Sequence, residues 1–140
     1  LRLEKGHLIV SQDTDGLTDP FEAGLGWAVK MDKPFFVGKR SLEILIRRGI
    51  RRQLVGFTIP SDLGIPFENH LLVDKDQIVG RVTSVASSHA IGCTVGLAFV
   101  SSKYVQPETR LYIKTDNGEL CEASVAPTPF IDPEGCRLRS

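Results

Sequence analysis

The sequence has few cysteines and none of the paired spacings that cysteine-dependent sites require. No C-x-x-C pair occurs in its 140 residues, and the three cysteines are far apart: Cys93, Cys121 and Cys136. A thioredoxin-like redox motif and a C-x-x-C zinc site therefore have no basis in the sequence, and no metal site is expected. An odd cysteine count also argues against a disulfide framework, so we expect free thiols and a reducing compartment.

The sequence also lacks an excess of charge of either sign. Seventeen basic and seventeen acidic residues give a formal net charge of zero at pH 7. Nothing in this balance would recruit nucleic acid or an anionic membrane surface. No apolar run approaches the ~18 residues of a membrane-spanning helix. With 41% hydrophobic and 24% charged residues, the composition is that of an ordinary soluble globular protein.

The start of the chain predicts two strands separated by a loop. Apolar residues from Leu1 to Val10 surround Gly6, which indicates a strand with an irregularity at the glycine. Residues 11–26 are rich in Asp, Thr, Gly and Pro and indicate a loop. The apolar stretch Gly24–Val29 then predicts a second strand.

One segment, Lys39–Arg48, has a clear helical pattern. Its apolar face is formed by residues at three- and four-residue spacing: Leu42, Leu45 and Ile46. Gly49 follows the last turn, where glycine commonly forms a left-handed C-terminal cap. The basic cluster Arg47–Arg52 could contact phosphates, but a helix C-terminus favours cations, so we interpret it as a solvated helix end.

From residue 51 onward the pattern changes to short strands separated by glycine and proline, which is typical of a small antiparallel barrel. The expected strands are 53–59, 71–73, 77–85, 94–100, 110–114 and 119–125. Hairpin turns are expected at Asp74–Asp76 and at Asp116–Gly118, where an Asn-Gly pair tolerates positive φ. The sequence therefore predicts a mostly β fold with one helix and a module boundary near Arg51.

The residues alone identify no complete catalytic or metal-binding constellation. Asp13-x-Asp15-Gly16 begins like a calcium loop, but the ligand and glycine positions that follow in an EF-hand are not matched. Ser87–His89 lacks the glycine pattern of a nucleophile elbow. On this basis the chain is a globular β module without an assigned activity.

Several short motifs, in order, resemble the glycine cleavage T-protein (aminomethyltransferase) family. They are Leu1–Gly6, Gly24–Trp27, Phe36–Lys39, Gln53–Gly56, Gly80–Ser84, Gly96–Ala98 and Pro129–Phe130. Two further stretches, Gln12–Gly16 and Asp132–Gly135, look most like the α-subunit of heterotetrameric sarcosine oxidase. The resemblance is to the C-terminal part of the family, and the chain starts at Leu1 within a predicted strand, so we expect a fragment of a longer polypeptide.

The resemblance implies a tetrahydrofolate-dependent enzyme. A T-protein transfers a one-carbon unit from an aminomethyl group on a lipoyl arm to tetrahydrofolate and releases ammonia. Residues 1–50 would be the tail of a folate-binding domain, truncated here, and residues 51–140 the C-terminal antiparallel barrel. The family's essential aspartate lies in the missing N-terminal folate-binding region, so no catalytic residue is assigned and the chain alone is expected to be inactive. A lipoyl carrier protein is an implied partner, and the bacterial cytoplasm or mitochondrial matrix the implied compartment.

The family's folate contacts carry over to four positions. Glu4 matches the glutamate that holds the pterin, whose adjacent N–H and amino groups suit one ionised carboxylate; without the resemblance we would interpret Glu4 as facing solvent. Arg137 falls where relatives place an arginine that can bind folate carboxylates, with an exposed tail residue as the alternative. Lys33 and Arg40 occupy a stretch where another basic contact is expected, and the sequence does not decide which one, if either, fills it. Residues 85–90 depart from the family pattern, so no substrate contact is assigned to them.

Two other functions stay open: the C-terminal folate module of a flavin-dependent sarcosine or dimethylglycine oxidase or dehydrogenase, and a non-catalytic folate-binding or structural barrel.

The first fifty residues contain many apolar groups, including Trp27 and Phe35. We expect part of this set to bury against the missing region, while Leu42, Leu45 and Ile46 pack onto the barrel. The isolated chain is then expected to self-associate through residues 1–37.

Overall fold

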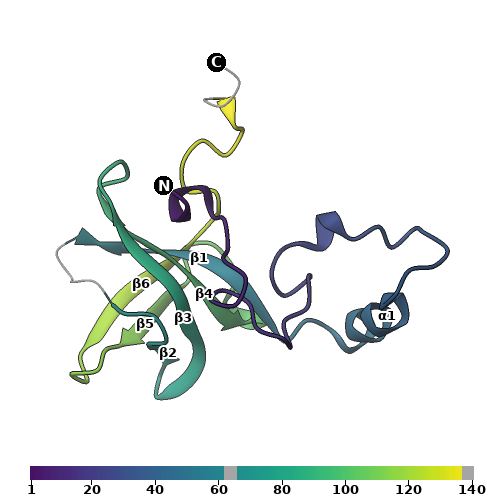
Figure 1. Ribbon diagram of the computed structural model, residues 1–140. Helices are drawn as coiled ribbons and strands as arrows, with labels where there is room; N and C mark the ends of the chain where they lie inside the picture. Colours follow the sequence, from purple (N-terminus) through teal and green to yellow (C-terminus); the bar gives the residue numbers. More distant parts are fainter. Residues whose placement is uncertain (62–65, 137–140) are drawn as a thin grey trace.

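The computed structural model describes residues 1–61 and 66–136, and its main feature is a closed barrel (Figure 1). The barrel strands are β1 (Arg52–Pro60), β2 (Leu71–Asp74), β3 (Gln77–Ser88), β4 (Cys93–Ser101), β5 (Arg110–Lys114) and β6 (Leu120–Ala126). They close in the order β1-β4-β3-β2-β5-β6, and all neighbours are antiparallel. The predicted fold class, a mostly β chain with an antiparallel barrel and one helix, is confirmed.

Alternation of side chains along the strands fills the barrel interior. In β5 the buried residues are Leu111 and Ile113, and in β6 they are Cys121, Ala123 and Val125. Phe57 and Ile59 of β1 complete this core and are 1% and 0% exposed. Each fully buried side chain of this size contributes roughly 1.5–3 kcal/mol to folding, so the barrel has its own hydrophobic core.

Two motif glycines permit a close approach between the strands of the barrel. A Cβ at Gly96 in β4 would meet the Phe57 ring and would lie 2.5 Å from the Ser84 carbonyl oxygen. A Cβ at Gly80 in β3 would meet the Phe99 carbonyl. Because backbone atoms cannot move aside like a flexible side chain, both positions need glycine.

The hairpin turns lie where the sequence predicted them. Between β2 and β3, Lys75 and Asp76 have φ of +45° and +67°, which matches the left-handed residues of a tight hairpin turn. Between β5 and β6, Gly118 has φ of +80° and donates its N–H to the Thr115 carbonyl oxygen at 2.9 Å. Local turn chemistry therefore sets both connections.

The two strands predicted before the barrel are wrong. Leu3–Lys5 and Gly26–Ala28 are 3₁₀ turns, and the first ends at Gly6 with φ of +65°. Among the described residues, the pairing near these segments is one isolated bridge between Val10 and Thr14. A strand needs a partner with unpaired backbone groups, and a closed barrel presents no free edge.

The helix α1 (Lys39–Arg48) has the bounds that the sequence predicted. Gly49 has φ of +80° but ψ of 149°, so it is a positive-φ residue without the left-handed helical cap that we expected. The expected packing of Leu42, Leu45 and Ile46 onto the barrel is also wrong, because α1 lies beside the barrel and has no buried residue (Figure 1). Within the described residues, no helix has the length and apolarity to cross a membrane.

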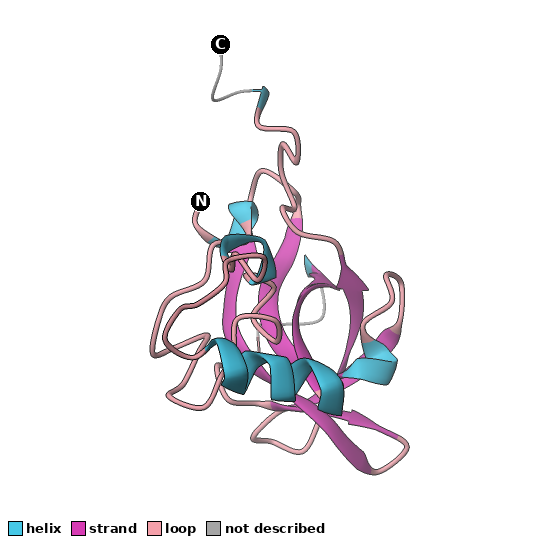
Figure 2. Cartoon of the chain, turned by 90° about the vertical axis from the view of Figure 1, so that its right-hand side faces the viewer, coloured by secondary structure: helices cyan, strands magenta, loops and turns pink. Residues whose placement is uncertain are grey.

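Residues 20–50, which we call the helical segment, are attached to the barrel mainly at their start. The Glu22 carbonyl accepts the Leu54 N–H at 2.8 Å, and the Glu22 carboxylate pairs with Arg52 Nε at 3.1 Å. In Figure 2 α1 lies in front of the barrel, and Figure 1 shows that the helix stands apart from the strands. The attachment is therefore polar and local, while the helix keeps its apolar face outside the barrel core.

Candidate functional site

The turn that carries Glu4 is held on the outside of the barrel by an apolar anchor and by its backbone. Leu3 is 7% exposed and packs with Val95 and Leu97 of β4. The Glu4 carbonyl oxygen accepts the Ile131 N–H at 3.0 Å. Since neither contact uses the Glu4 side chain, the turn presents that carboxylate from a fixed backbone.

The segment after β6 returns to the same turn. Lys5 Nζ donates to the Asp132 carbonyl oxygen at 3.0 Å and contacts its carboxylate Oδ2 at 2.9 Å. A Cβ at Gly6 would lie 2.8 Å from Thr128 Cβ, so the chain after β6 passes directly against this glycine. The first and last motifs of the sequence are therefore in contact, and in Figure 1 the yellow stretch after β6 passes beside the purple N-terminal turn.

The Glu4 carboxylate is partly enclosed and polarised. Its Oε1 accepts the Ser88 hydroxyl at 2.5 Å, and the side chain is 15% exposed. The Ser88 hydrogen bond is the main cause that lowers the pKa of Glu4 below its ordinary value. Glu4 is thus an ionised acceptor rather than the solvent-facing strand residue that composition alone would suggest.

A second polar cluster joins two motifs that are 70 residues apart. Asp13 is fully buried, and its Oδ1 accepts the hydroxyls of Thr83 at 2.5 Å and Ser84 at 2.6 Å. Its Oδ2 accepts Arg2 Nη1 at 3.0 Å and the Ile9 N–H at 2.8 Å. These four donors satisfy the buried charge, so the cluster fixes the loop to β3 and leaves no acceptor for a ligand.

The sequence pattern did not reveal this role of Asp13. The Asp-x-Asp-Gly spacing indicated a turn, and the turn is present at Asp15, whose carboxylate accepts the Leu17 N–H at 3.0 Å and the Thr18 hydroxyl at 2.7 Å. These bonds lower the pKa of Asp15. Asp13 instead turns inward. Adjacent residues of a regular strand point to opposite faces, so the Thr83-Ser84 pair gave no signal, but β3 has a bulge between Val82 and Ser84, and both hydroxyls bind Asp13.

The other predicted ligand contacts are not gathered around Glu4. Lys33 and Arg40 are exposed and belong to the helical segment, and no hydrogen bond or ion pair among residues 1–61 and 66–136 joins either of them to Glu4. Lys33 supplies its carbonyl oxygen to Lys39 Nζ at 2.5 Å. Arg137 lies outside the described residues.

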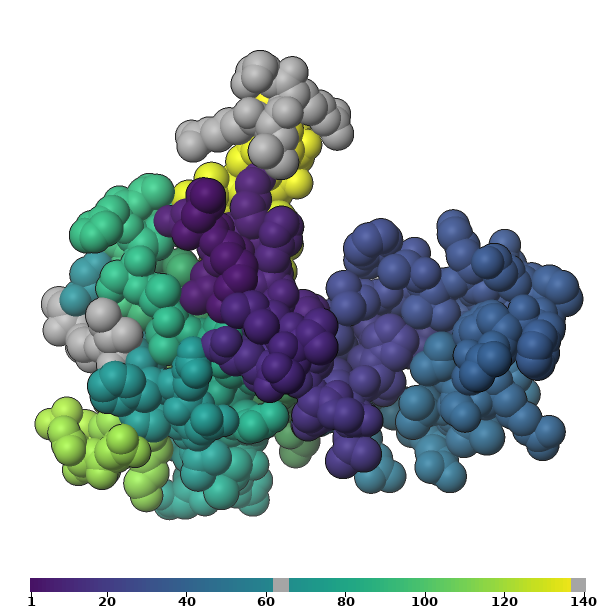
Figure 3. Space-filling model, viewed as in Figure 1, coloured from purple at the N-terminus to yellow at the C-terminus, as the bar shows by residue number. Residues whose placement is uncertain are grey.

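A groove runs from the Glu4 turn toward the helical segment. It is lined by residues 5–8, by the 23–27 stretch with Trp27, and by the barrel residues Leu54 and Leu97. Figure 3 shows the helical segment as a separate mass beside the barrel, with an open notch between it and the N-terminal turn. Trp27, which lines the groove, is 80% exposed.

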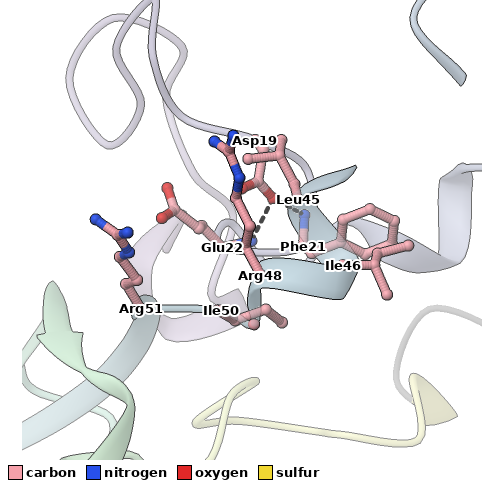
Figure 4. Close-up of a pocket in the computed structure, with 9 residues that line it drawn as sticks. Asp19, Phe21, Glu22, Leu45, Ile46, Arg48, Ile50 and Arg51 are labelled. Atoms are coloured by element: carbon pink, nitrogen blue, oxygen red, sulfur yellow. Dashed lines mark hydrogen bonds between the residues drawn. The ribbon is translucent and has the colours of Figure 1, made fainter. Parts of the chain in front are cut away.

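A smaller hollow lies between α1 and the preceding loop (Figure 4). Leu45, Ile46 and Ile50 face Phe21 across it. The Asp19 carboxylate at its edge already accepts the N–H groups of Phe21 and Glu22, at 2.8 and 3.0 Å. The hollow therefore explains where the apolar side of α1 packs, and the barrel is not that partner.

Comparison with known proteins agrees with this architecture. The family model described as the glycine cleavage T-protein C-terminal barrel domain matches residues 52–132. An aminomethyltransferase of Halothermothrix orenii is 37% identical over 94% of this chain and 36% of its own length, and a probable aminomethyltransferase of Haloarcula marismortui is 34% identical over 94% of this chain and 37% of its own.

A solved structure extends the likeness to the residues before the barrel. The crystal structure of glycine cleavage system aminomethyltransferase T from Bartonella henselae matches with a TM-score of 0.86 and 26% identity. The match covers 95% of this chain and 37% of that one. The chain thus spans little more than a third of the length of the relatives that it matches, and the likeness includes the turns and the helical segment as well as the barrel.

Proposed function

Because the chain belongs to the glycine cleavage T-protein family, we propose that it supplies the C-terminal part of a tetrahydrofolate-dependent aminomethyltransferase. In this function a one-carbon unit passes from an aminomethyl donor to tetrahydrofolate. The observation that carries the proposal is the likeness of 94–95% of the chain to aminomethyltransferases, one of them of known structure. The turn that presents Glu4 belongs to the part of the chain covered by this likeness.

We propose that Glu4 accepts hydrogen bonds from the pterin ring. A pterin edge offers an N–H and an amino group side by side, and an ionised carboxylate has two oxygens with about four lone-pair positions. Ser88 uses one position on Oε1, so both oxygens retain acceptor capacity. A glutamate carboxylate is ionised near neutral pH, the Ser88 hydrogen bond lowers the pKa of Glu4 further, and charge-assisted hydrogen bonds are the stronger kind. The residues at this turn therefore fit the donor groups of the cofactor.

The proposed cationic contacts to the folate carboxylates are based on positions in the family. Arg137 would bind a folate carboxylate through its guanidinium, and Lys33 or Arg40 would supply a second cation. Both residues of the helical segment are exposed and so are available to a ligand or to another part of the enzyme. Their assignment follows from the family positions and not from a contact with Glu4.

We further propose that the helical segment faces the remaining part of the relatives' fold. Trp27, Phe35 and Val37 are 80%, 80% and 93% exposed, which is unusual for large apolar groups close together in sequence. The relatives contain almost two-thirds of their length beyond the matched part, because the match covers 36–37% of them. A folate-binding region in that remainder would cover these side chains, and a lipoyl carrier protein would deliver the aminomethyl donor.

Calorimetric titration with tetrahydrofolate tests the proposed binding role in the complete polypeptide that contains this sequence. The Glu4→Gln variant keeps the size of the side chain but removes its charge and replaces one acceptor by a donor. We expect about a 10- to 100-fold loss of affinity, the range for hydrogen bonds to a charged group. Glu119→Gln, at an exposed hairpin position, is the matched control and should bind as the unmodified protein does. Equal affinity of both variants would contradict the role of Glu4.

A turnover assay tests the activity itself. The complete polypeptide should form methylene-tetrahydrofolate and ammonia from an aminomethyl-lipoyl donor. The 140-residue chain alone should form neither product. Amine oxidation with reduction of a bound flavin would instead indicate the oxidase alternative, and folate binding without turnover would indicate a non-catalytic module.

A further inference from the structure

Ser88 is the last residue of β3, and neither the sequence pattern nor the family likeness assigned it a role. Its side chain is buried, with the residue 5% exposed, although serine is usually a surface residue. Its hydroxyl oxygen lies 2.5 Å from Glu4 Oε1, across 84 positions of sequence. The contact joins the barrel to the side chain that we propose as the pterin acceptor.

The direction of this hydrogen bond follows from the neighbouring groups. The Ser88 hydroxyl oxygen already accepts the Ile91 N–H at 3.2 Å. An ionised carboxylate carries no proton and can only accept, so the single hydroxyl proton of Ser88 points at Glu4. The backbone of Ser88 is fixed as well, because its carbonyl oxygen accepts the Gly92 N–H at 2.9 Å and the residue pairs with Cys93 across the hairpin. Ser88 is therefore a donor of fixed position and orientation.

The hydrogen bond is not required to dock the turn. Leu3 anchors the turn in an apolar cluster, Ile131 binds the Glu4 carbonyl, and Lys5 binds Asp132. None of these three contacts involves the Ser88 hydroxyl. The consequence of the hydrogen bond falls on the carboxylate itself: it selects one rotamer of Glu4 and favours the charged form.

We propose that Ser88 is a positioning residue, which holds the Glu4 carboxylate in the orientation that the pterin N–H groups require. This inference rests on the proposed function of Glu4. Ser88 itself does not touch the ligand. Its hydroxyl occupies one acceptor position of Oε1 and leaves Oε2 for the donors of the ligand.

The test measures tetrahydrofolate affinity in the complete polypeptide as a function of pH, with four variants. Ser88→Ala should lower the affinity about 3- to 10-fold at pH 7, the effect of one hydrogen bond. It should also move the acid loss of binding to higher pH, because Glu4 then becomes protonated more readily. Ser88→Thr retains a hydroxyl on a β-compatible residue and should restore both properties. Ser87→Ala removes a neighbouring exposed hydroxyl and is the matched control.

Each outcome has one meaning. Reduced affinity and a shifted pH profile in Ser88→Ala alone, with rescue by Ser88→Thr, support the inference. Unchanged affinity and profile in Ser88→Ala, while Glu4→Gln loses binding, overturn the inference and leave the proposed function intact. Unchanged binding in Glu4→Gln overturns both. A Ser88→Ala protein whose thermal unfolding midpoint collapses would show a structural role for Ser88 and would also overturn the inference.

Discussion

The barrel and the first fifty residues differ in how far they bury their apolar side chains. Every barrel strand has two hydrogen-bonded neighbours, and its apolar side chains alternate into a shared interior. Of the first fifty residues, the buried ones are Leu3, Asp13 and Ala23. Large apolar groups there, such as Trp27 and Phe35, stay exposed. A closed sheet can satisfy its own backbone and core, whereas turns and a single helix need another surface.

The contacts between the two regions are mostly polar. Asp13 and Arg2 bind β3, Lys5 binds Asp132, and Glu22 binds Arg52. Such contacts orient one part on another, but they bury little apolar area. The difference suggests that the barrel determines the stability of the chain, while the first fifty residues determine what the chain can join.

We expect the largest effect on stability from removal of the buried Asp13 carboxylate, which joins the first fifty residues to β3. Asp13→Ala removes the acceptor of the Ser84 hydroxyl and the Ile9 N–H, while Arg2 keeps the His7 carbonyl and Thr83 keeps the Leu97 carbonyl. We expect the free energy of unfolding to fall by about 3 kcal/mol, since each buried donor left unsatisfied costs about 1–3 kcal/mol. Urea denaturation measures this change. Asp32→Ala, at an exposed position, is the control and should stay within about 0.5 kcal/mol of the unmodified chain.

The second prediction concerns self-association through the exposed apolar groups of the first fifty residues. The 140-residue chain by itself should self-associate through residues 1–37, and Trp27→Ser should weaken this association by about 10-fold or more, since one buried large side chain contributes roughly 1.5–3 kcal/mol. Leu120→Ser, which removes a 60% exposed side chain from the barrel, should leave it unchanged. Sedimentation equilibrium distinguishes the two. A monomer at high concentration would contradict the prediction.

Gly96 tests how tightly the barrel is packed. Gly96→Ala places a methyl group against the Phe57 ring and the Ser84 carbonyl, so we expect a loss of about 1–3 kcal/mol in the free energy of unfolding. Gly16→Ala is the matched control, because a Cβ there meets no atom within 4 Å. Equal unfolding midpoints for the two variants would show that the barrel relaxes around the added methyl group.

The smallest effect concerns acid stability. The Ser88 hydrogen bond lowers the pKa of Glu4 below its ordinary value of 4.5, so the folded state binds this proton less readily than the unfolded chain does. The resulting stabilisation is present above the ordinary pKa and is lost as pH falls through the folded pKa. Ser88→Ala should therefore show a flatter dependence of unfolding free energy on pH in the acid range. Superimposable profiles would indicate that this hydrogen bond does not stabilise the charged form.

Local patterns predicted the elements whose stability is local. The bounds of α1 followed from its three- and four-residue spacing, and both hairpins followed from turn residues between alternating segments. The same approach failed at Leu1–Val10 and Gly24–Val29, because apolar content near a glycine does not reveal whether a partner strand exists. The predicted packing of α1 on the barrel was wrong for a similar reason, since an amphipathic pattern shows which face is apolar but not which surface it contacts.

The candidate site likewise contains one residue that the sequence could identify and one that it could not. Glu4 could be singled out from its motif, and the donor groups it would suit follow from carboxylate chemistry. Its partner Ser88 could not be found in this way, because the two are 84 positions apart and a serine at the end of a strand has no distinctive pattern. The domain boundary near Arg51 and the roles of Lys33, Arg40 and Arg137 stay predictions.

The sequence by itself determined the barrel strands, the helix and the family, because these depend on short-range periodicity and on motifs that occur in the family's order. Only the tertiary structure decided that Asp13 would be buried by β3, that Glu4 would receive the Ser88 hydroxyl, and that α1 would stand apart from the barrel. These outcomes depend on closure of the barrel, which removes every strand edge and brings together side chains that no local spacing connects.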